Sequence, residues 1–294
     1  MALGYEGYVK IGDKYALGTG TAVPRVRNRL DSSGGYGGQV SSPIGEIGIG
    51  SPRTYDWDTY DGSLSFEVTK DIFLLVKSWI LARDTEKTIL FSSRKDNEQS
   101  FDEAYWNSIS ISASDGSLVE GSLGFVALDR TNYAYGATGP NGFIDNKLGA
   151  ELLCPLADGM PSPLNVGSLN LNPVPSWYTK ITLGSKAYDF VSWTLDFSQD
   201  VVKFFACNNT VGPQGPAYMG VGPMTAVLSG AFMFADFPVD SIGSGSGLIA
   251  KVDVADSSMT FNKLELNTNS DDIQSLDSTV PVSIEYNIYE LTAT

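Results

Sequence analysis

The 294-residue sequence contains no histidine and only two cysteines, Cys154 and Cys207. Without an imidazole, the chain cannot form a Ser-His-Asp or Cys-His nucleophile, a histidine-ligated zinc or haem site, or an imidazole acid-base step. Two thiols cannot complete a four-thiolate zinc site, and they make no disulfide framework for a chain of this length. We therefore expect two separate reduced thiols, with a bridge between them as the alternative, and no zinc held by them.

Long apolar runs and nucleotide-binding motifs are also missing. No run approaches the roughly 20 apolar residues that a membrane-spanning helix requires, and the first ten residues lack a basic segment followed by an apolar one. We expect synthesis in the cytosol and no membrane partner. No P-loop is present, and Gly45, Gly48 and Gly50 do not form the GxGxxG pattern, so no nucleotide cofactor is predicted.

Carboxylate chemistry is the enzymatic alternative that remains, because a glycoside hydrolase needs only two acids at a fixed separation. Asp196 and Asp200, or Glu285 and Glu290, would supply such a pair. Similar pairs occur in any acidic protein, and solvated acids on sheet faces are the simpler interpretation. We predict that the protein is not an enzyme and has no cofactor.

The charge balance is strongly acidic. The 34 Asp and Glu residues outnumber the 19 Lys and Arg residues, which gives a formal net charge of −15. Such a chain repels a phosphate backbone unless its basic residues gather on one face, so sequence-specific nucleic-acid binding is not expected. The same negative charge is compatible with contact with DNA that does not lead to tight binding.

Strand-like alternation of apolar and polar residues dominates the sequence. It appears within 62–69 and again within 108–114, and the Asp115-Gly116 pair predicts a tight hairpin into a strand over 118–128. Residues 70–83 instead have apolar spacing near 3.6, with Thr69 as a candidate N-cap. The predicted fold class is mainly β, a β-sandwich or α+β fold, with antiparallel sheets and one flanking helix near residues 70–83.

The second half of the chain repeats this strand pattern. Residues 188–198 alternate as 108–114 do, residues 226–236 resemble 117–127 in placing a glycine in mid-strand, and further strands are predicted near 248–254, 259–266 and 280–289. Residues 131–175 are rich in Gly, Asn and Pro. The repeat predicts two β-rich domains, 1–135 and 176–294, joined by a connection over 136–175. The alternative is one elaborated domain over 1–294.

An acidic segment is a candidate calcium site. Asp56, Asp58, Asp61 and Glu67 occupy positions like those of a calcium loop, but Tyr60 replaces an expected ligand and Asp61 stands where the loop needs glycine. A plain acidic turn is the alternative interpretation.

A basic segment is a candidate contact between copies of the chain. Arg25, Arg27 and Arg29 would share one face of an extended strand, where they would pair with acidic strands of a neighbouring copy. A solvated edge strand, whose charges block unwanted pairing, explains them equally well.

Several segments together resemble a known family. The opening GYVKIG, the strand and helix GSLSFEVTKDIFLLVKSWI, the long Pro/Gly loop, and the strands YDFVSWTLDFSQDVV and TAVLSGAFMF are similar in pattern to the tail tube (major tail) proteins of tailed bacteriophages. The resemblance implies a β-sandwich flanked by a helix, whose copies form rings that stack into a hollow tube for genome passage. It also implies contacts with other tail proteins, DNA that passes without specific binding, and a place in the virion after synthesis in the host bacterial cytoplasm.

The resemblance further implies that an inner sheet lines the bore. Small polar and acidic strand faces would give a wall that does not bind phosphate. We assign seven residues to this wall as a hypothesis: Ser108, Ser110, Ser112, Ser114, Thr194, Asp196 and Ser198. The chain is about twice as long as the simplest family members, so a ring would contain three chains with pseudo-sixfold symmetry if the repeat is real, and six otherwise.

Other functions remain open from the sequence. A capsid-decorating protein or another tail component would share nearly all these features. A carbohydrate-binding β-sandwich module is an alternative of another class, in which exposed Trp57, Trp106 or Trp177 would be the binding platform.

Overall fold

The computed structural model describes residues 8–28, 55–94, 97–128, 131–134, 172–188, 190–204, 218–233, 248–267 and 281–292. Its elements, in chain order, are β1 (Tyr8–Ile11), β2 (Lys14–Asn28), β3 (Tyr55–Glu67), α1 (Lys70–Leu81), β4 (Lys87–Arg94), β5 (Asn97–Ser114), β6 (Glu120–Ala127), β7 (Thr131–Ala134), the short 3-10 helix η3 (Ser176–Tyr178), β8 (Thr179–Leu183), β9 (Lys186–Tyr188), β10 (Phe190–Phe204), β11 (Tyr218–Met233), β12 (Leu248–Val254), β13 (Ser257–Leu266) and β14 (Pro281–Thr292). The strand pairs are antiparallel. The predicted mainly-β, antiparallel class with one flanking helix is confirmed.

The helix begins where the sequence predicts. The backbone N–H of Ile72 donates to Thr69 Oγ1 at 3.3 Å, and Asp71 lies in the first turn, where it complements the helix dipole. The helix ends at Leu81, two residues before the predicted end. Its buried stripe consists of Ile72, Phe73, Val76, Trp79 and Ile80.

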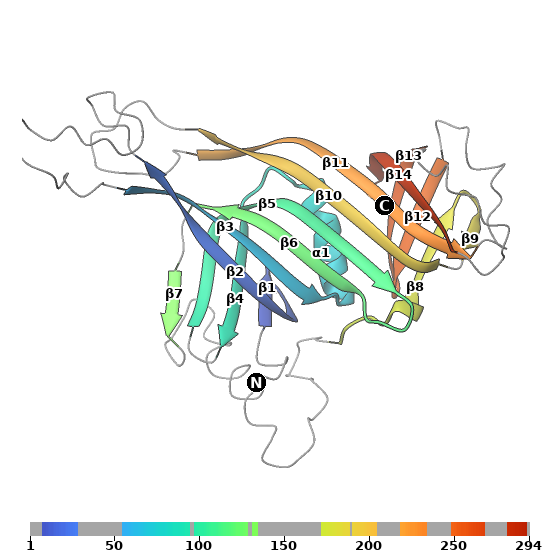
Figure 1. Ribbon diagram of the computed structural model, residues 1–294, viewed down its shortest axis with the longest axis horizontal. Coiled ribbons are helices and arrows are strands. Elements are labelled where there is room, and N and C mark those ends of the chain that lie inside the picture. Colours follow the sequence, from blue (N-terminus) through green and yellow to red (C-terminus); the bar gives the residue numbers. More distant parts are fainter. Residues whose placement is uncertain are drawn as a thin grey trace, which may run out of the picture.

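Six strands of the first half close into a ring. β1 pairs with β2, β2 with β3, β3 with β6, β6 with β5, β5 with β4, and β4 with β1 again. Ring closure leaves these strands fewer unpaired edges than an open sheet has. We call residues 8–134 the closed half (Figure 1).

The longest strand, β5, also begins the rest of the sheet. The first part of β5 pairs with β4, whereas its last part, 108–114, pairs with β10. From β10 the described strands continue through β11, β14, β13, β12 and β8 to β9. We call residues 172–292 the open half.

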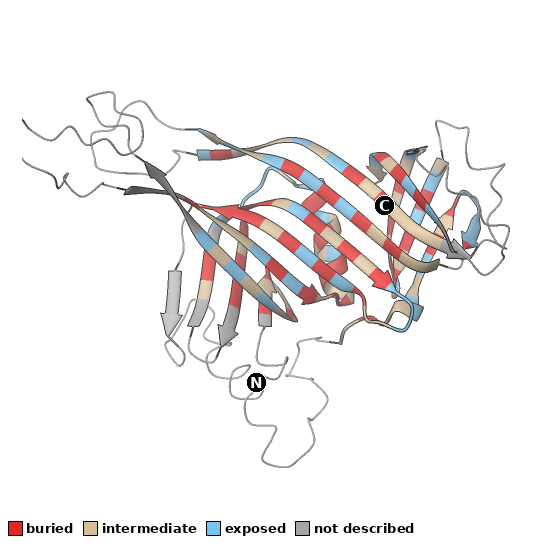
Figure 2. Cartoon of the chain, in the orientation of Figure 1, coloured by how far each residue is buried: buried red, intermediate tan, exposed pale blue. Residues whose placement is uncertain are grey.

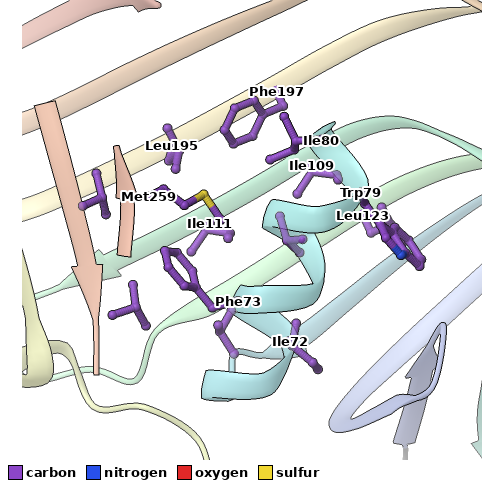
Figure 3. Packing of buried hydrophobic residues seen from close by; sticks show 14 of the residues in the cluster. Ile72, Phe73, Trp79, Ile80, Ile109, Ile111, Leu123, Leu195, Phe197 and Met259 are labelled. Atoms are coloured by element: carbon purple, nitrogen blue, oxygen red, sulfur yellow. The ribbon is translucent and has the colours of Figure 1, made fainter. Parts of the chain in front are cut away.

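One buried apolar cluster joins the two halves. Figure 2 shows burial alternating along much of the described sheet, as in β10 and β13, where one face of the strand points to the core. In Figure 3, side chains of α1 lie among Ile109 and Ile111 of β5, Leu195 and Phe197 of β10, and Met259 of β13. The two halves therefore share a core. The first predicted domain boundary, at residue 135, lies outside the described residues, and the second, between Pro175 and Ser176, lies at the start of η3. Both stay a prediction.

The sequence-based interpretation of residues 56–62 as a turn is wrong. This segment lies inside β3, which pairs with β2 from Tyr55 to Phe66. The two strands are long, with 15 residues in β2 and 13 in β3. Cross-strand pairing over this length outweighs the turn preference of the Asp and Gly residues, which is a local effect.

Candidate functional site

The two serine-rich and acidic strand faces noted in the sequence lie side by side. β5 and β10 are adjacent, and their register places Ser108 opposite Ser198, Ser110 opposite Asp196, and Ser112 opposite Thr194. Ser114 continues the set opposite Ser192. The predicted residues therefore form one surface, although they come from strands about 85 positions apart in the chain.

The same surface extends across the neighbouring strands in three rows of cross-strand partners. The first row is Thr21, Ser63, Gly124, Ser108, Ser198 and Thr225. The second is Thr19, Ser65, Ser122, Ser110, Asp196, Val227, Asn287 and Glu265. The third is Glu67, Glu120, Ser112, Thr194, Ser229 and Glu285. We call these three rows the polar face.

The side chains of the polar face are mostly small, and its charged members are all acidic. None of its members is Lys or Arg, and each is exposed or half-buried. Its charged members are Glu67, Glu120, Asp196, Glu265 and Glu285. The three rows therefore present mainly hydroxyls and carboxylates, and none of their members is a cation that would neutralise a phosphate group.

The two-residue period of the strands produces this surface. The residues between its members point to the core: Ile109 and Ile111 on β5, and Leu195 and Phe197 on β10, are buried. Gly124 keeps the first row close-packed, because a Cβ at that position would overlap the side chains of Asn107 and Ser108. A slip of one residue in either strand would exchange the two faces.

Neighbouring side chains on the polar face bond to one another. The hydroxyls of Thr21 and Ser63 are 3.1 Å apart, and those of Ser198 and Thr225 are 2.7 Å apart. Glu67 and Glu120 are direct cross-strand partners. Burial, and then the charge of Glu120, raise the pKa of Glu67 above its ordinary value.

A hollow of about 540 Å³ lies at the end of the polar face where the first row runs. Ser108, Ser198 and Thr225 line it together with Asp200 and Lys203. Lys203 is outside the three rows, and its Nζ donates to Thr59 Oγ1 at 2.6 Å. Beyond the hollow, the surface turns apolar, with Tyr105, Val126 and Met219 in a small buried cluster.

The acids of the calcium hypothesis lie along one strand. Asp56, Asp58, Asp61 and Glu67 are all in β3, and eleven residues of extended chain separate the first from the last by roughly 35 Å. β3 therefore does not form the loop that the hypothesis requires. Within the described residues, no group of three or more Cys, Asp or Glu is arranged to hold a metal ion.

The basic segment is a strand for as far as it is described. Arg25 lies opposite Thr59, and Arg27 lies opposite Asp56, in the pairing of β2 with β3. Arg29 is outside the described residues. The two cysteines, Cys154 and Cys207, are outside them as well.

The two acid pairs considered for glycoside hydrolysis are widely spaced. Asp196 and Asp200 are four residues apart on β10, about 13 Å along the strand, and Glu285 and Glu290 are five apart on β14, which places them on opposite faces. Catalytic carboxyl pairs in glycosidases are about 5 to 9.5 Å apart. Neither pair has this geometry.

Of the three tryptophans considered as sugar platforms, Trp106 is fully buried in the core. The Trp57 side chain is outside the described residues. Trp177 is 72% exposed and lies in η3, where it lines a hollow of about 720 Å³.

Sequence reasoning missed most of the polar face. It did not identify the members of the polar face on β2, β3, β6, β11 and β14. Thr19 and Thr21, Ser63 and Ser65, and Ser229 are nevertheless small polar residues in alternating patterns. The alternation shows that a strand has a polar side. It does not show which polar sides adjoin.

No helix in the described part of the chain has the length and apolar character needed to cross a membrane. No protein-family model matches the chain, and no curated protein matches it either.

Proposed function

We propose that the protein is a structural subunit whose copies assemble into rings, and that the rings stack into a hollow tube with the polar face lining its bore. DNA would pass through this bore, as the resemblance to phage tail tube proteins implies. The single observation that supports the proposal is the polar face: three cross-strand rows without a Lys or Arg. The tube would belong to a virion and would contact other tail proteins.

The chemistry of the polar face suits passage without adhesion. Duplex DNA carries one negative charge per about 1.7 Å of its axis, and proteins bind it chiefly by neutralising phosphates with Lys and Arg. A wall of hydroxyls and five carboxylates does not neutralise phosphate, so contacts with DNA remain weak and non-specific. Without histidine, the wall also has no side chain whose ordinary pKa lies near neutrality.

The width of the polar face fits a ring of few copies. Its second row crosses eight strands, β2 to β13, and seven inter-strand spacings of about 4.8 Å give a width of about 34 Å per copy. Three copies would line a circumference of about 100 Å, and six would line about 200 Å. The mass of one ring distinguishes the two assemblies.

Electron microscopy of the purified protein tests the assembly. We expect hollow tubes in negative stain, built from rings of three or six chains. Particles that stay monomeric at high protein concentration and at every salt concentration would contradict the proposal.

Cysteine labelling of assembled tubes tests which face lines the bore. In a background without the native cysteines (Cys154→Ser and Cys207→Ser), Ser108→Cys should react with a small maleimide but not with a maleimide on a large polymer. The control is Ser78→Cys on α1, an exposed serine outside the polar face, which we expect to react with both reagents in the tube. In unassembled protein, both positions should react with both. Equal reaction of Ser108→Cys with the large reagent in tubes would place the polar face outside and refute the assignment.

A further inference from the structure

The closed half and the open half pair their strands in the same order. In the open half β8 pairs with β9, which is followed after one residue by β10; β10 pairs with β11, β11 with β14, β14 with β13, β13 with β12, and β12 with β8. This is the order of the closed half when β1 is matched to β8, β2 to β9 and β10 together, β3 to β11, β4 to β12, β5 to β13 and β6 to β14. The match also follows the order of the strands along the chain. The two halves therefore repeat one strand arrangement, which differs from the sequence repeat in aligning β10 with β2 instead of β5.

Two backbone features recur at matched positions. The hairpins β1–β2 and β8–β9 both turn through a left-handed glycine, Gly12 at a φ of +60° and Gly184 at +61°. In β5 and in β13 a residue other than glycine is left-handed, Glu103 at +52° and Lys263 at +56°, and each lies where the register with β4 or β12 shifts. Left-handed residues other than glycine are uncommon, so this recurrence supports the match.

The joint between the two halves shows which matched strands pair. Within the chain, 108–114 of β5 pair antiparallel with 192–198 of β10 (Figure 1). β5 in the closed half corresponds to β13 in the open half, and β10 corresponds to β2. The same joint, made by the open half of one copy, would therefore bring its β13 to β2 of another copy.

β2 has the free edge that this joint requires. It pairs with β1 only as far as Leu17, and with β3 from Gly18 to Asn28. From Gly18 on, the edge opposite β3 has no partner strand among the described strands, whereas β5 covers the corresponding edge of β10. An edge of this length is a template for pairing with another chain.

The end of β13 is free on the matching side. β13 pairs with β12 as far as Leu264, and on that side Glu265 and Leu266 have no partner strand among the described strands. The other side of β13 pairs with β14. In the closed half, β5 leaves β4 in the same way before it reaches β10.

From this repeat we infer a contact between copies: the free edge of β2 in one copy pairs antiparallel with the end of β13 in the next. Because the two edges differ, the contact is heterologous and repeats from copy to copy. The polar face would continue across it, since the second row begins on β2 at Thr19 and ends on β13 at Glu265.

The basic segment belongs to the same edge. Arg25 and Arg27 are in β2, and β13 ends beyond the acidic Glu265, so residues of opposite charge lie on the two strands that pair. This gives the predicted contact through Arg25 and Arg27 a specific partner. Pro24 offers no N–H to the edge, which removes one bond near the end of the stretch that matches 192–198.

The inference rests on the proposed assembly and specifies how copies join side by side. The bore assignment concerns which face of the sheet points inwards, whereas this contact concerns the edges of the sheet. The two can therefore fail separately.

Hydrogen exchange tests whether the edge of β2 is covered. Amides of residues 18–23 that point away from β3 should exchange at least tenfold more slowly in assembled than in unassembled protein, because they gain a partner strand. Residues 192–198 are the matched control: β5 and β11 flank them in each copy, so their exchange should not change. Unchanged exchange over 18–23, or equal slowing over 192–198, would overturn the inference.

The joint inside the chain identifies two residues that should meet between copies. Counted from the left-handed residues of β5 and β13, Asn267 matches Asn107. Counted from the turn glycines, with one extra residue in β10 before Ser192, Arg25 matches Ser198. Asn107 and Ser198 line the same hollow, so Asn267 of one copy should lie close to Arg25 of the next.

Cross-linking tests which strand covers the edge. In the Cys154→Ser and Cys207→Ser background, we combine Arg25→Cys with Asn267→Cys and treat the assembled protein with a short bismaleimide. The chain with both substitutions should give a ladder of covalent oligomers, because each copy links to one neighbour at each edge. A mixture of the two single variants should give only dimers, and either alone should give none. Strand pairing uses backbone groups, so the substitutions leave the contact itself in place.

The other cross-linking results overturn the inference. Dimers from Asn267→Cys alone would mean that two β13 ends meet symmetrically. The control pair, Arg25→Cys with Ser78→Cys, uses an exposed serine on α1, and a ladder as strong as that of the test pair would show random collision. Tubes in the microscope without a ladder would refute this contact and leave the proposed tube intact. A ladder from particles that never form tubes would support the contact and refute the tube.

Discussion

In the closed half, strand pairing leads from β1 back to β1, so the strands form a ring. The open half instead ends on β9, a strand of three residues. The closed half also contains the one α-helix of the described chain, and α1 packs on the core faces of both halves. The open half has no such cover of its own among the described elements. It instead exposes Phe204 and Tyr218 at the paired ends of β10 and β11, and Trp177 in η3.

The two halves therefore differ in two properties that matter for assembly: whether strand edges are paired within the chain, and whether groups are left exposed for contact. A closed ring satisfies most of its own strand edges, so few are left to pair with other chains. An open sheet leaves edges and exposed apolar groups that contacts with other copies can cover. The polar face crosses the seam between β5 and β10, so both halves contribute to it.

The largest expected effect tests whether the two halves unfold together. Phe125 in the closed half and Phe261 in the open half are fully buried in one cluster. Phe125→Ala and Phe261→Ala should each lower the free energy of unfolding by about 3 to 5 kcal/mol, since each leaves a cavity. Urea denaturation followed by fluorescence and by circular dichroism should show one transition that both substitutions move.

Two separable transitions, each moved by only one of the substitutions, would contradict the shared core and favour two independent domains. Leu74→Ala is the control, because Leu74 is exposed on α1 and its truncation leaves no cavity.

Local structure was predictable from local sequence. The helix near 70–83 follows from a 3.6-residue apolar spacing and Thr69, and the turn at Asp115-Gly116 follows from that pair, with Gly116 at a φ of +71° that favours glycine. Both signals lie in short, continuous segments of the sequence. They depend little on the rest of the fold.

Pairing between distant strands was not predictable. The alternation of Ser108 to Ser114 and of Thr194 to Ser198 showed two polar strand sides, but only the β5–β10 register makes them one surface. Likewise the Asp-rich segment 56–62 has turn residues, and its pairing with β2 makes it a strand. Such pairing depends on which partners complete the core, and a single segment does not contain that information.

The helix cap tests how far the open half depends on the closed half. Thr69 is buried, and its hydroxyl oxygen accepts the bond that begins α1. Thr69→Ala should cost about 1 kcal/mol of unfolding free energy, whereas Thr69→Ser, which keeps the oxygen, should cost less. Hydrogen exchange should report the loss in β13 as well as in α1, because the two elements pack together.

Exchange that changes in α1 alone would mean that the open half is stable without the helix. Equal losses for the alanine and serine variants would mean that Thr69 acts through its methyl group and not as a cap.

Removal of a buried hydroxyl in the open half should not destabilise the protein, in contrast to the substitutions above. Tyr286 is buried on β14, its hydroxyl has no hydrogen-bond partner among the described residues, and burial raises its pKa well above the ordinary value. Tyr286→Phe should leave the protein as stable or stabilise it by up to about 1 kcal/mol, because it removes an unsatisfied polar group.

Tyr289 on the same strand is the matched control. Its exposed hydroxyl donates to Glu265 Oε2 at 2.7 Å, so Tyr289→Phe should cost at most about 0.5 kcal/mol. Thermal denaturation checks both. A clear loss of stability in Tyr286→Phe would indicate that its hydroxyl has a partner outside the described residues.

The smallest effect concerns acids that the two halves place differently on the polar face. In the closed half, Glu67 and Glu120 face each other across strands; in the open half, Glu285 accepts a bond from Asn267 Nδ2 at 2.6 Å. The raised pKa of Glu67 means that the folded state holds its proton more tightly than the unfolded state does. The stability that protonated Glu67 contributes is therefore fully present below the ordinary glutamate pKa of about 4.3, and it is lost as pH rises through the pKa of Glu67 in the folded state.

Glu67→Gln should remove this pH-dependent loss. Relative to the wild type, the variant should gain melting temperature at pH 7, and the difference should shrink as pH falls to 4 and below, where the wild-type carboxyl becomes mostly protonated in both states. In a Glu120→Gln background the gain should be smaller, because one of its two causes is gone. A gain that is the same at pH 4 and pH 7 would assign the effect to packing instead of charge, and a loss at pH 7 would mean that the carboxylate has a favourable partner on the polar face.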